Sequence, residues 1–402
     1  MPASTSIASL AGGTVPALNN PAMTATLEPT APSAARSSIV TTFFAVLKRA
    51  TELNASDVHV SAGGPFRLRI RGQMASVTGM PNLEPEDTAK IAAEILTAAK
   101  KATPATISAV LSGLRDIDCS YSQPGLGRFR VNLCSQRGSI ALVLRTIPVT
   151  VPDFQQLGLP SVIRDIAMED RGLILVTGVT GSGKSSTLAA MVSFLNQNRA
   201  AKIVAIEDPI EFLHQDSKSV VIQRELGGDT DSFSSALRAA LRQDPDIIML
   251  GEMRDQETID IALKAAETGH LVFSTAHTTD AVKTISRLVS VFEPAEQQSI
   301  RYRLSETLRA VVSQRLLPHK DGKGRVAAVE IMRHTGAVQE YIADPDRTNE
   351  IKDLIATGRT QYGMQTFDQH LMELYRDGTI SEAVALSAAT SPADFARNLE
   401  FQ

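Results

Sequence analysis

Gly-Leu-Ile-Leu-Val-Thr-Gly-Val-Thr-Gly-Ser-Gly-Lys-Ser-Ser-Thr, residues 172–187, is the stretch that decides the fold. Its apolar run Leu173–Val176 predicts a short buried strand. A glycine-rich turn follows, and the composition favours a helix from Ser185 onward. The frame Gly-x-x-x-x-Gly-Lys-Ser at 178–185, with a strand before it and a helix after it, is a complete P-loop motif.

The residue types of this loop suit phosphate binding. Glycines let backbone N–H groups approach a phosphate without obstruction by Cβ atoms, and the helix N-terminus adds its positive dipole end. Lys184 can reach the β- and γ-phosphates, and the Ser185 hydroxyl can ligate a metal, so the predicted ligands are ATP and Mg²⁺. The candidate nucleotide-binding residues are Gly178, Thr180, Gly181, Ser182, Gly183, Lys184, Ser185 and Ser186.

Composition limits the class of protein. A chain of 402 residues has room for two or three domains. The net charge of −4, the 4% of aromatic residues and the absence of tryptophan disfavour a nucleic-acid partner. No apolar run reaches membrane-spanning length, and no Lys or Arg precedes Arg36, so we expect a cytoplasmic protein without direct membrane insertion. The two cysteines, Cys119 and Cys134, are expected to be reduced core thiols.

Composition and periodicity also divide the chain. The predicted parts are a disordered arm at 1–37, a small α+β domain at 38–146, a proline-containing linker at 147–160, an α/β domain at 161–340 and a helical C-terminal region at 341–402. Short apolar strands alternate with helical segments after the P-loop, which is typical of a doubly wound, mostly parallel sheet. Residues 281–316 are predicted to be helical.

Polar residues follow three further predicted strands, at 203–206, 247–250 and 271–274. They are Glu207, Glu211, Glu252 and His277. Because ligands of open α/β sheets bind at the carboxyl ends of the strands, we expect these side chains to lie beside the P-loop.

Arginines alternate with apolar residues in the small domain. Arg128 and Arg130 share one face of a predicted strand at 128–133, and Arg145 ends the next strand. Two interpretations are open. The arginines form a solvated basic face, or one or two of them reach a phosphate bound to a neighbouring P-loop domain, as arginine fingers do.

Several longer motifs carry a family resemblance. They are Glu207-Asp-Pro-Ile-Glu-Phe212, Gln223-Arg-Glu225, Ala239-Ala-Leu-Arg-Gln-Asp-Pro-Asp246, Gly251-Glu-Met-Arg-Asp-Gln-Glu-Thr258, Ala266-Glu-Thr-Gly-His-Leu271 and Gly363-Met-Gln-Thr-Phe-Asp368. From about residue 40 to 380 the chain resembles the secretion-superfamily ATPases, above all the retraction motors of type IV pili of the PilT and PilU kind.

The resemblance implies a PAS-like N-terminal domain, a RecA-like P-loop ATPase domain and a homo-hexameric ring. It places Glu207 and Glu211 in an acidic box, Gly251-Glu252 in an atypical Walker B motif, and His277, with His270 upstream, in a histidine box. It also implies a role at the phosphates for Arg130, and less directly for Arg128 and Arg145. Glu252 is the candidate for orienting the attacking water, with Glu211 and His277 assisting and Ser185 on Mg²⁺.

Two departures from the family refine the prediction. Extension and type II secretion ATPases carry a tetracysteine zinc motif, which a chain with two cysteines cannot form. Retraction motors of the PilT kind carry Ala-Ile-Arg-Asn-Leu in the C-terminal region, whereas Glu350-Ile-Lys-Asp-Leu-Ile355 here is closer to accessory proteins of the PilU kind.

The function that these residues predict is a hexameric, Mg²⁺-dependent ATPase that powers type IV pilus retraction. Its expected partners are a pilus platform protein of the inner membrane, which would hold it at that membrane, and a paralogous retraction ATPase. Alternatives within the superfamily are an accessory retraction ATPase and a secretion or conjugation motor. Alternatives of other classes are a RecA-type DNA translocase and a non-hydrolysing, nucleotide-gated adaptor.

Overall fold

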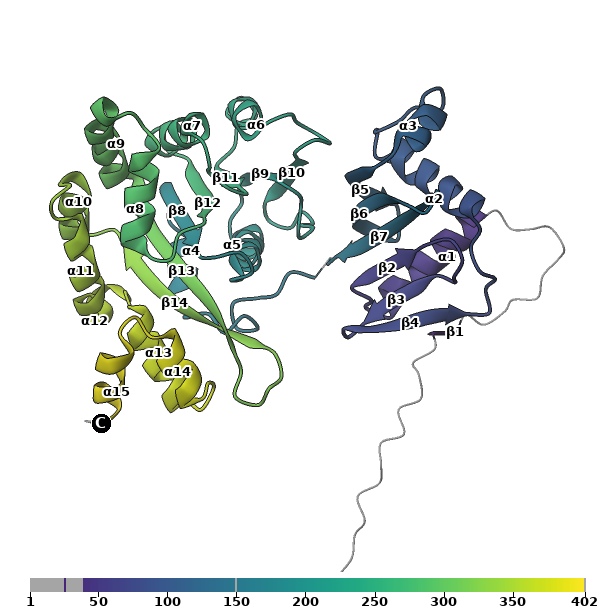
Figure 1. The fold of residues 1–402 in the computed structure, drawn as a ribbon. Helices are drawn as coiled ribbons and strands as arrows, with labels where there is room; N and C mark the ends of the chain where they lie inside the picture. Colours follow the sequence, from purple (N-terminus) through teal and green to yellow (C-terminus); the bar gives the residue numbers. More distant parts are fainter. Residues whose placement is uncertain (1–24, 27–38, 149, 401–402) are drawn as a thin grey trace, which may run out of the picture. The chain divides into compact units, whose positions relative to one another are not determined.

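The computed structural model describes residues 25–26, 39–148 and 150–400 (Figure 1). It divides the chain into two compact units, Met1–Asp118 with Val131–Thr146, and Cys119–Arg130 with Ile147–Gln402. The predicted disordered arm at 1–37 lies outside the described residues, apart from Ala25–Thr26, which form the short strand β1. Among the described residues, no helix combines the length and the apolar character needed to cross a membrane.

The first sheet has seven strands in the order β1-β4-β3-β2-β7-β6-β5. Their bounds are Ala25–Thr26 (β1), Gln73–Thr78 (β4), Arg67–Ile70 (β3), Asp57–Val60 (β2), Ser139–Ile147 (β7), Gly127–Gln136 (β6) and Asp116–Gln123 (β5). Three helices accompany it: Ile39–Glu52 (α1), Pro85–Ala98 (α2) and Ile107–Gly113 (α3). In α1, Phe43, Val46, Leu47 and Ala50 recur at helical spacing and are buried, so this helix packs through one apolar face.

The second sheet, also of seven strands, holds the P-loop strand near its middle, in the order β10-β9-β11-β12-β8-β13-β14. Its strands are Val220–Glu225 (β10), Lys202–Glu207 (β9), Ile247–Leu250 (β11), Leu271–Ala276 (β12), Gly172–Thr177 (β8), Leu308–Pro318 (β13) and Arg325–Arg333 (β14). Every neighbouring pair is parallel except β13 and β14, which form an antiparallel hairpin.

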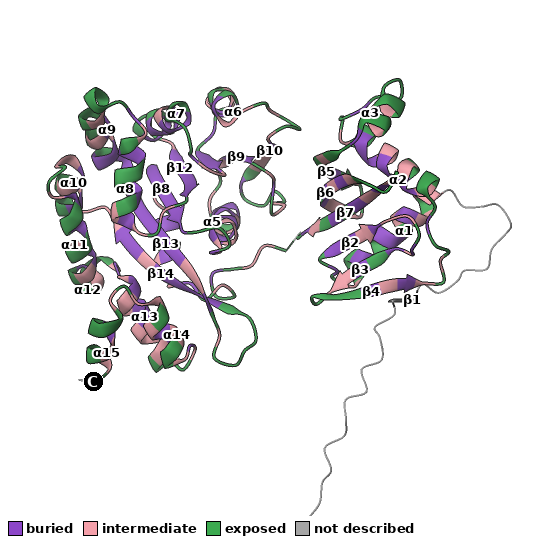
Figure 2. Cartoon of the chain, viewed as in Figure 1, coloured by how far each residue is buried: buried purple, intermediate pink, exposed green. Residues whose placement is uncertain are grey.

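Helices cover both faces of this sheet, and every residue of β8 is buried (Figure 2). The helices are Val162–Ala167 (α4), Lys184–Asn198 (α5), Phe233–Ala240 (α6), Gln256–Glu267 (α7), Ala281–Ser290 (α8), Pro294–Thr307 (α9), Gly336–Ala343 (α10), Ile351–Thr357 (α11), Arg359–Tyr362 (α12), Phe367–Arg376 (α13), Glu382–Ala388 (α14) and Pro392–Glu400 (α15), with a 3₁₀ turn at Thr348–Glu350 (η1). One core joins α4 and α5 to one face, and a second joins α6 to α11 to the other. The last helices, α13 to α15, pack on the β13–β14 hairpin.

The fold confirms the predicted mixed α/β character and the four strands around the P-loop, and it corrects one segment. Residues 281–316 are helical only as far as Thr307 in α9, because Leu308–Pro318 form strand β13. This strand pairs with β8 on one side and β14 on the other, so its backbone groups are satisfied by the sheet. The edge strand β10 was not anticipated from the sequence.

Candidate nucleotide site

The P-loop begins where β8 ends. Gly178, Gly181 and Gly183 have φ values of +146°, +79° and +92°, a region that favours glycine. A Cβ atom on Gly178 would overlap with the Ser182 hydroxyl and the Gln314 carbonyl. The loop therefore requires its glycines for conformation as well as for access, and helix α5 begins directly after it at Lys184.

Lys184 is buried within the P-loop motif, with a relative exposure of 9%. Its Nζ donates hydrogen bonds to the backbone oxygens of Gly178 at 2.8 Å and Val179 at 3.1 Å. Burial lowers the pKa of the Lys184 ammonium, although the carboxylates of Glu252 and Glu211 act to raise it. The Ser182 hydroxyl is buried with no hydrogen-bond partner among the described residues, so it offers an unsatisfied donor inside the loop.

Strand β13 is hydrogen-bonded to residues on both sides of the P-loop. The Thr177 hydroxyl donates to the Ser313 hydroxyl at 3.0 Å, and the Gln314 side-chain amide donates to the Thr187 hydroxyl at 2.8 Å. Both contacts are buried, and they join the strand before the P-loop and the helix after it to the same neighbour. The geometry of the loop is thus fixed by the sheet.

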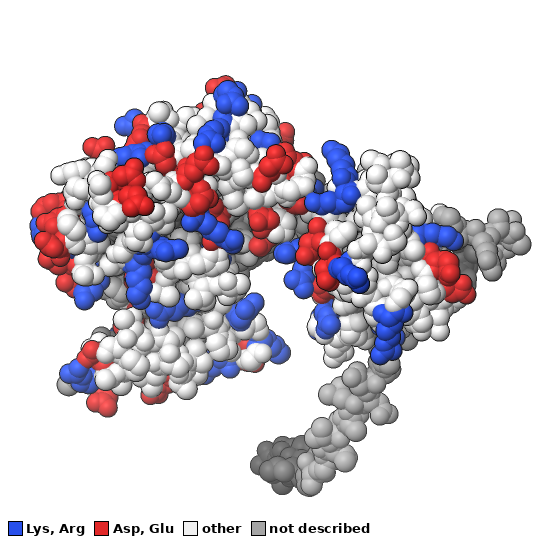
Figure 3. Space-filling view, turned by 45° about the horizontal axis from the view of Figure 1, so that its top comes forward, with Lys and Arg blue, Asp and Glu red and all other residues white. Residues whose placement is uncertain are grey.

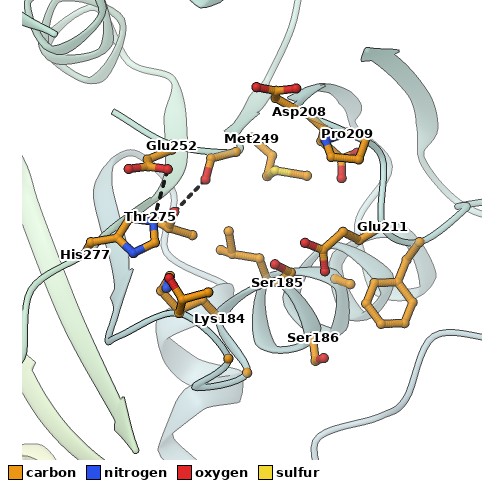
Figure 4. Close-up of a pocket in the computed structure, with 18 of the residues that line it drawn as sticks. Lys184, Ser185, Ser186, Asp208, Pro209, Glu211, Met249, Glu252, Thr275 and His277 are labelled. Atoms are coloured by element: carbon orange, nitrogen blue, oxygen red, sulfur yellow. Dashed lines mark hydrogen bonds and ion pairs between the residues drawn. The ribbon is translucent and has the colours of Figure 1, made fainter. Parts of the chain in front are cut away.

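The strand ends converge on one cavity of about 450 Å³ (Figure 4). It is lined by P-loop residues, by residues from the ends of β9, β11 and β12, and by residues of the β13–β14 hairpin. Of the predicted site residues, those in the lining are Thr180, Gly181, Gly183, Lys184, Ser185, Ser186, Glu207, Glu211, Glu252 and His277. The expectation that these side chains lie beside the P-loop is therefore met.

Glu252 follows β11 and is held by the side chains of Arg254 and His277. Its Oε2 accepts from Arg254 Nη2 at 2.6 Å and lies 3.2 Å from His277 Nε2 (Figure 4). Burial acts to raise the pKa of Glu252, but the hydrogen bonds and charges of Arg254 and His277 outweigh it and lower that pKa. The carboxylate is consequently ionised at neutral pH and faces the P-loop cavity.

Glu207, at the end of β9, is in the opposite electrostatic situation. Its pKa is raised to about 7, chiefly by burial and also by the nearby carboxylates of Glu211 and Glu225, while a hydrogen bond from Gln223 acts to lower it. Among the described residues no cation lowers the pKa of Glu207 as Arg254 lowers that of Glu252, so Glu207 keeps its proton to a higher pH than an ordinary glutamate.

Gln223, on β10, makes hydrogen bonds to the segment that carries these acidic residues. Its side-chain amide donates to Glu207 Oε1 at 2.9 Å and to the Phe212 carbonyl at 2.8 Å, while its oxygen accepts from the backbone N–H of His214 at 2.9 Å. Two residues along the strand, Glu225 accepts from the backbone N–H of Ile210 at 3.0 Å. Strand β10 therefore positions the segment in which Glu211 lies.

Some predicted residues lie elsewhere. Gly178 and Ser182 are not among the residues that line the cavity. His270 precedes β12, at the opposite end of the strand from His277, and its ring contacts Ala265 and Thr268. Arg145 donates to Asp57 at 3.0 Å, and Arg130 is exposed on β6. Neither arginine is among the described residues that line the cavity, and their role at a phosphate stays a prediction.

Sequence reasoning missed several side chains of the cavity. Arg254, His214, Leu316 and Arg325 all line it, and burial lowers the pKa of His214 to about 4, which leaves that ring neutral. Arg254 was indicated by the sequence, because this residue lies two positions after Glu252 in the motif at 251–258. No sequence pattern indicated Leu316, since residues 281–316 were predicted to be helical.

The arrangement has the parts that phosphoryl transfer to water requires. A glycine loop and a helix N-terminus can hold the phosphates, a buried lysine supplies positive charge, and an ionised glutamate across the cavity can orient a water molecule. Fold and site together define a P-loop ATPase.

Comparison with known proteins gives the family. The model for Type II/IV secretion system proteins matches residues 33–398, and the chain belongs to this family. The chain is 45% identical over 341 residues to the type IV pilus retraction ATPase PilT of Pseudomonas aeruginosa, covering 85% of this chain and 96% of the relative. It is 38% identical over 354 residues to the type IV pilus ATPase PilU of the same organism, covering 88% and 90%. A crystal structure of the pilus retraction motor PilT with bound ADP superposes with a TM-score of 0.77 at 43% identity, covering 88% and 98%.

Proposed function

We propose that this chain is a motor that retracts a type IV pilus, with ATP hydrolysis in the P-loop cavity as its energy source. The observation that carries the proposal is the convergence of Lys184, Glu252 and His277 on one cavity. Similarity to a retraction ATPase over most of both chains supplies the biological process. The chain would act as a homo-hexamer on a platform protein of the inner membrane, as the family resemblance implies.

The catalytic roles follow from the geometry. Lys184 would exchange its two backbone acceptors for phosphate oxygens, and Glu252 would orient the attacking water while Arg254 and His277 hold its carboxylate. Glu211 points toward the side of the cavity on which Ser185 lies, where it can assist (Figure 4). Glu207 would act through the position of this acidic segment, and Arg130 and Arg145 would act at a phosphate in the assembled ring.

The chain's residues fit Mg²⁺ as the metal. In P-loop proteins one hydroxyl holds this ion together with phosphate oxygens and water, and the Ser185 side chain in the lining supplies that hydroxyl. Among the described residues no group of three or more His, Cys, Asp or Glu could hold a metal alone, so the ion would arrive with the nucleotide. When bound, it would neutralise charge on the phosphates.

We also propose that the second unit has a RecA-like core and that the first sheet with its helices is a PAS-like domain. The parallel order of strands around β8 and the antiparallel pairing of β2, β3, β4 and β7 support this division. A DNA translocase is disfavoured, because the net charge is −4 and acidic and basic side chains are interspersed over the face drawn in Figure 3.

An ATPase assay on the purified full chain tests the site. Lys184→Ala should abolish phosphate release with Mg²⁺ and ATP, because the loop loses its buried cation. Lys283→Ala, which removes an exposed lysine from α8, is the matched control and should leave turnover intact. Normal turnover in Lys184→Ala would overturn the site assignment.

A deletion strain tests the direction of the motor. Cells without this chain should carry excess pili and fail to twitch, and the wild-type chain should restore both properties. Cells without pili would instead indicate extension. The segment at 350–355, which resembles PilU-like proteins, favours an accessory role as the second candidate. That role predicts normal pilus numbers while a paralogous retraction ATPase remains.

A further inference from the structure

Helix α8 begins shortly after His277, and the polar side chains at its start are bonded to one another. The Thr278 hydroxyl lies 2.6 Å from that of Thr284, and Asp280 Oδ1 accepts from the backbone N–H of Lys283 at 2.8 Å. These contacts give the beginning of the helix a defined local structure. They stay within the segment and its own helix, so they do not attach it to the sheet.

Glu330, on β14, supplies that attachment. Its Oε1 accepts from the backbone N–H of Ala281 at 2.8 Å, and the Ser313 hydroxyl on β13 lies 3.5 Å from the same oxygen. Ala281 is the first residue of α8, and the first N–H groups of a helix have no partner inside it. The Ser313 hydroxyl also accepts from Thr177, the last residue of β8. One carboxyl oxygen therefore joins the helix start to the strands beside the P-loop.

The surroundings of Glu330 show which property of its side chain matters. Its pKa is raised to about 7, chiefly by burial and also by the Asp280 carboxylate, while the Ala281 N–H, the Arg315 guanidinium and the Ser313 hydroxyl act to lower it. The carboxyl group is consequently part protonated near neutral pH. A full negative charge is thus not what Glu330 provides, whereas an acceptor oxygen at this place is what the Ala281 N–H requires.

The segment that Glu330 attaches carries one of the two partners of Glu252. His277 Nε2 lies 3.2 Å from Glu252 Oε2, and the other partner, Arg254, is exposed (Figure 4). If the start of α8 moved away from β14, the short connection from β12 would move with it. The imidazole would then leave Glu252, and the carboxylate that orients water would lose part of its support.

We propose that Glu330 is a positioning residue for ATP hydrolysis, which keeps His277 beside Glu252 by holding the Ala281 N–H. Glu330 is not one of the described residues that line the cavity, so it acts through His277 and not on the nucleotide. This inference rests on the catalytic roles proposed for His277 and Glu252, and it adds to them a residue outside the cavity.

Steady-state ATPase kinetics of the purified full chain test the proposal. Glu330→Leu removes the acceptor, so kcat should fall about tenfold with an unchanged KM for ATP, because the P-loop is unaltered. Glu330→Gln keeps an acceptor oxygen and should retain kcat within about twofold. Glu340→Leu, an exposed change on α10, is the matched control and should turn over normally. A normal kcat in Glu330→Leu, or an equal loss in Glu330→Gln, would overturn the proposal.

A double-mutant cycle separates positioning from general destabilisation. If Glu330 acts through His277, Glu330→Leu should cause no further loss of kcat in a His277→Ala background. The same loss in both backgrounds would refute the proposal. Glu330→Asp, which withdraws the acceptor by one methylene, takes the place of Glu330→Leu in the cycle if the leucine variant does not fold.

The single variants distinguish this inference from the function on which it rests. A wild-type kcat in His277→Ala would refute the catalytic role proposed for His277, and this inference with it. A reduced kcat in His277→Ala together with a normal kcat in Glu330→Leu would refute the role of Glu330 alone.

Discussion

The two flanks of the P-loop are built by different physical means. The carboxylate flank, formed by Glu207, Glu211, Glu252 and His277, is dense in hydrogen bonds and contains groups with shifted pKa values. The hairpin flank, formed by Leu316, Pro318 and Arg325, presents an apolar surface and an exposed arginine for which the described residues give no ion pair. The first holds its charged groups in place through hydrogen bonds, whereas the second lines the cavity without a comparable network among the described residues.

The largest expected effect is the loss of kcat when Glu252, on the carboxylate flank, loses its charge. Glu252→Gln keeps the shape of the side chain and removes the charge that orients water, so kcat should fall about 10³-fold. ADP affinity should stay at the wild-type value, because the P-loop and the start of α5 are unaltered. Phosphate release and ADP titration measure the two quantities, and Glu257→Gln, an exposed change on α7, is the control. A parallel loss of ADP affinity would contradict the separation of the flanks.

The next effect is a pH dependence of stability that originates in Glu207. Its pKa is about 7 in the folded chain and about 4.5 when unfolded, so between these values the folded state binds more protons than the unfolded state. The free energy of unfolding should therefore decrease as pH rises from about 4.5 to 7 and level off above it, a contribution of about 3 kcal/mol.

Urea unfolding at several pH values measures this contribution. Glu207→Gln should make the decrease shallower, and the remaining slope is expected from Glu330, whose pKa burial raises to about 7 as well. Identical pH profiles for wild type and Glu207→Gln would mean that Glu207 ionises normally in the folded chain.

The smallest effect concerns the hydrogen bonds between Gln223 and the segment at 207–214, which contains Glu207 and Glu211. Gln223→Leu removes three hydrogen bonds at similar volume, so the unfolding free energy should fall by about 2 kcal/mol. Because the segment also positions Glu211, kcat should fall about tenfold with an unchanged KM for ATP. Gln256→Leu, an exposed glutamine with one bond to Glu296, is the control. Lost stability with a normal kcat would limit Gln223 to a structural role.

The sequence predicted the carboxylate flank far better than the hairpin flank. Glu252 and His277 follow short apolar strands directly, and the rule that ligands bind at carboxyl ends of parallel strands was sufficient to place them. Leu308–Leu317 contains apolar residues in a pattern compatible with either a helix or a buried strand, and only pairing with β8 decides between them. Once this strand was missed, Leu316 and Arg325 could not be connected with the P-loop.

Contacts between distant residues account for the other omissions. Gln223 is 16 residues from Glu207, and no local pattern indicates that its amide bonds to a residue of the neighbouring strand β9. Arg254 was visible in a motif, but its bond to Glu252 depends on side-chain direction after β11. The roles of Arg130 and Arg145 stay predictions, because they concern a phosphate bound to a neighbouring domain.

The two hydrogen bonds that Lys184 makes to its own loop have an energetic consequence for the motor. A phosphate that enters must compete with the Gly178 and Val179 carbonyls, so binding exchanges one set of partners for another. When the product leaves, the Gly178 and Val179 carbonyls accept hydrogen bonds from Lys184 again, so the buried ammonium is not left without a partner. These internal hydrogen bonds therefore lower the net affinity of the loop for phosphate, which favours the release of ADP and phosphate after each hydrolysis cycle.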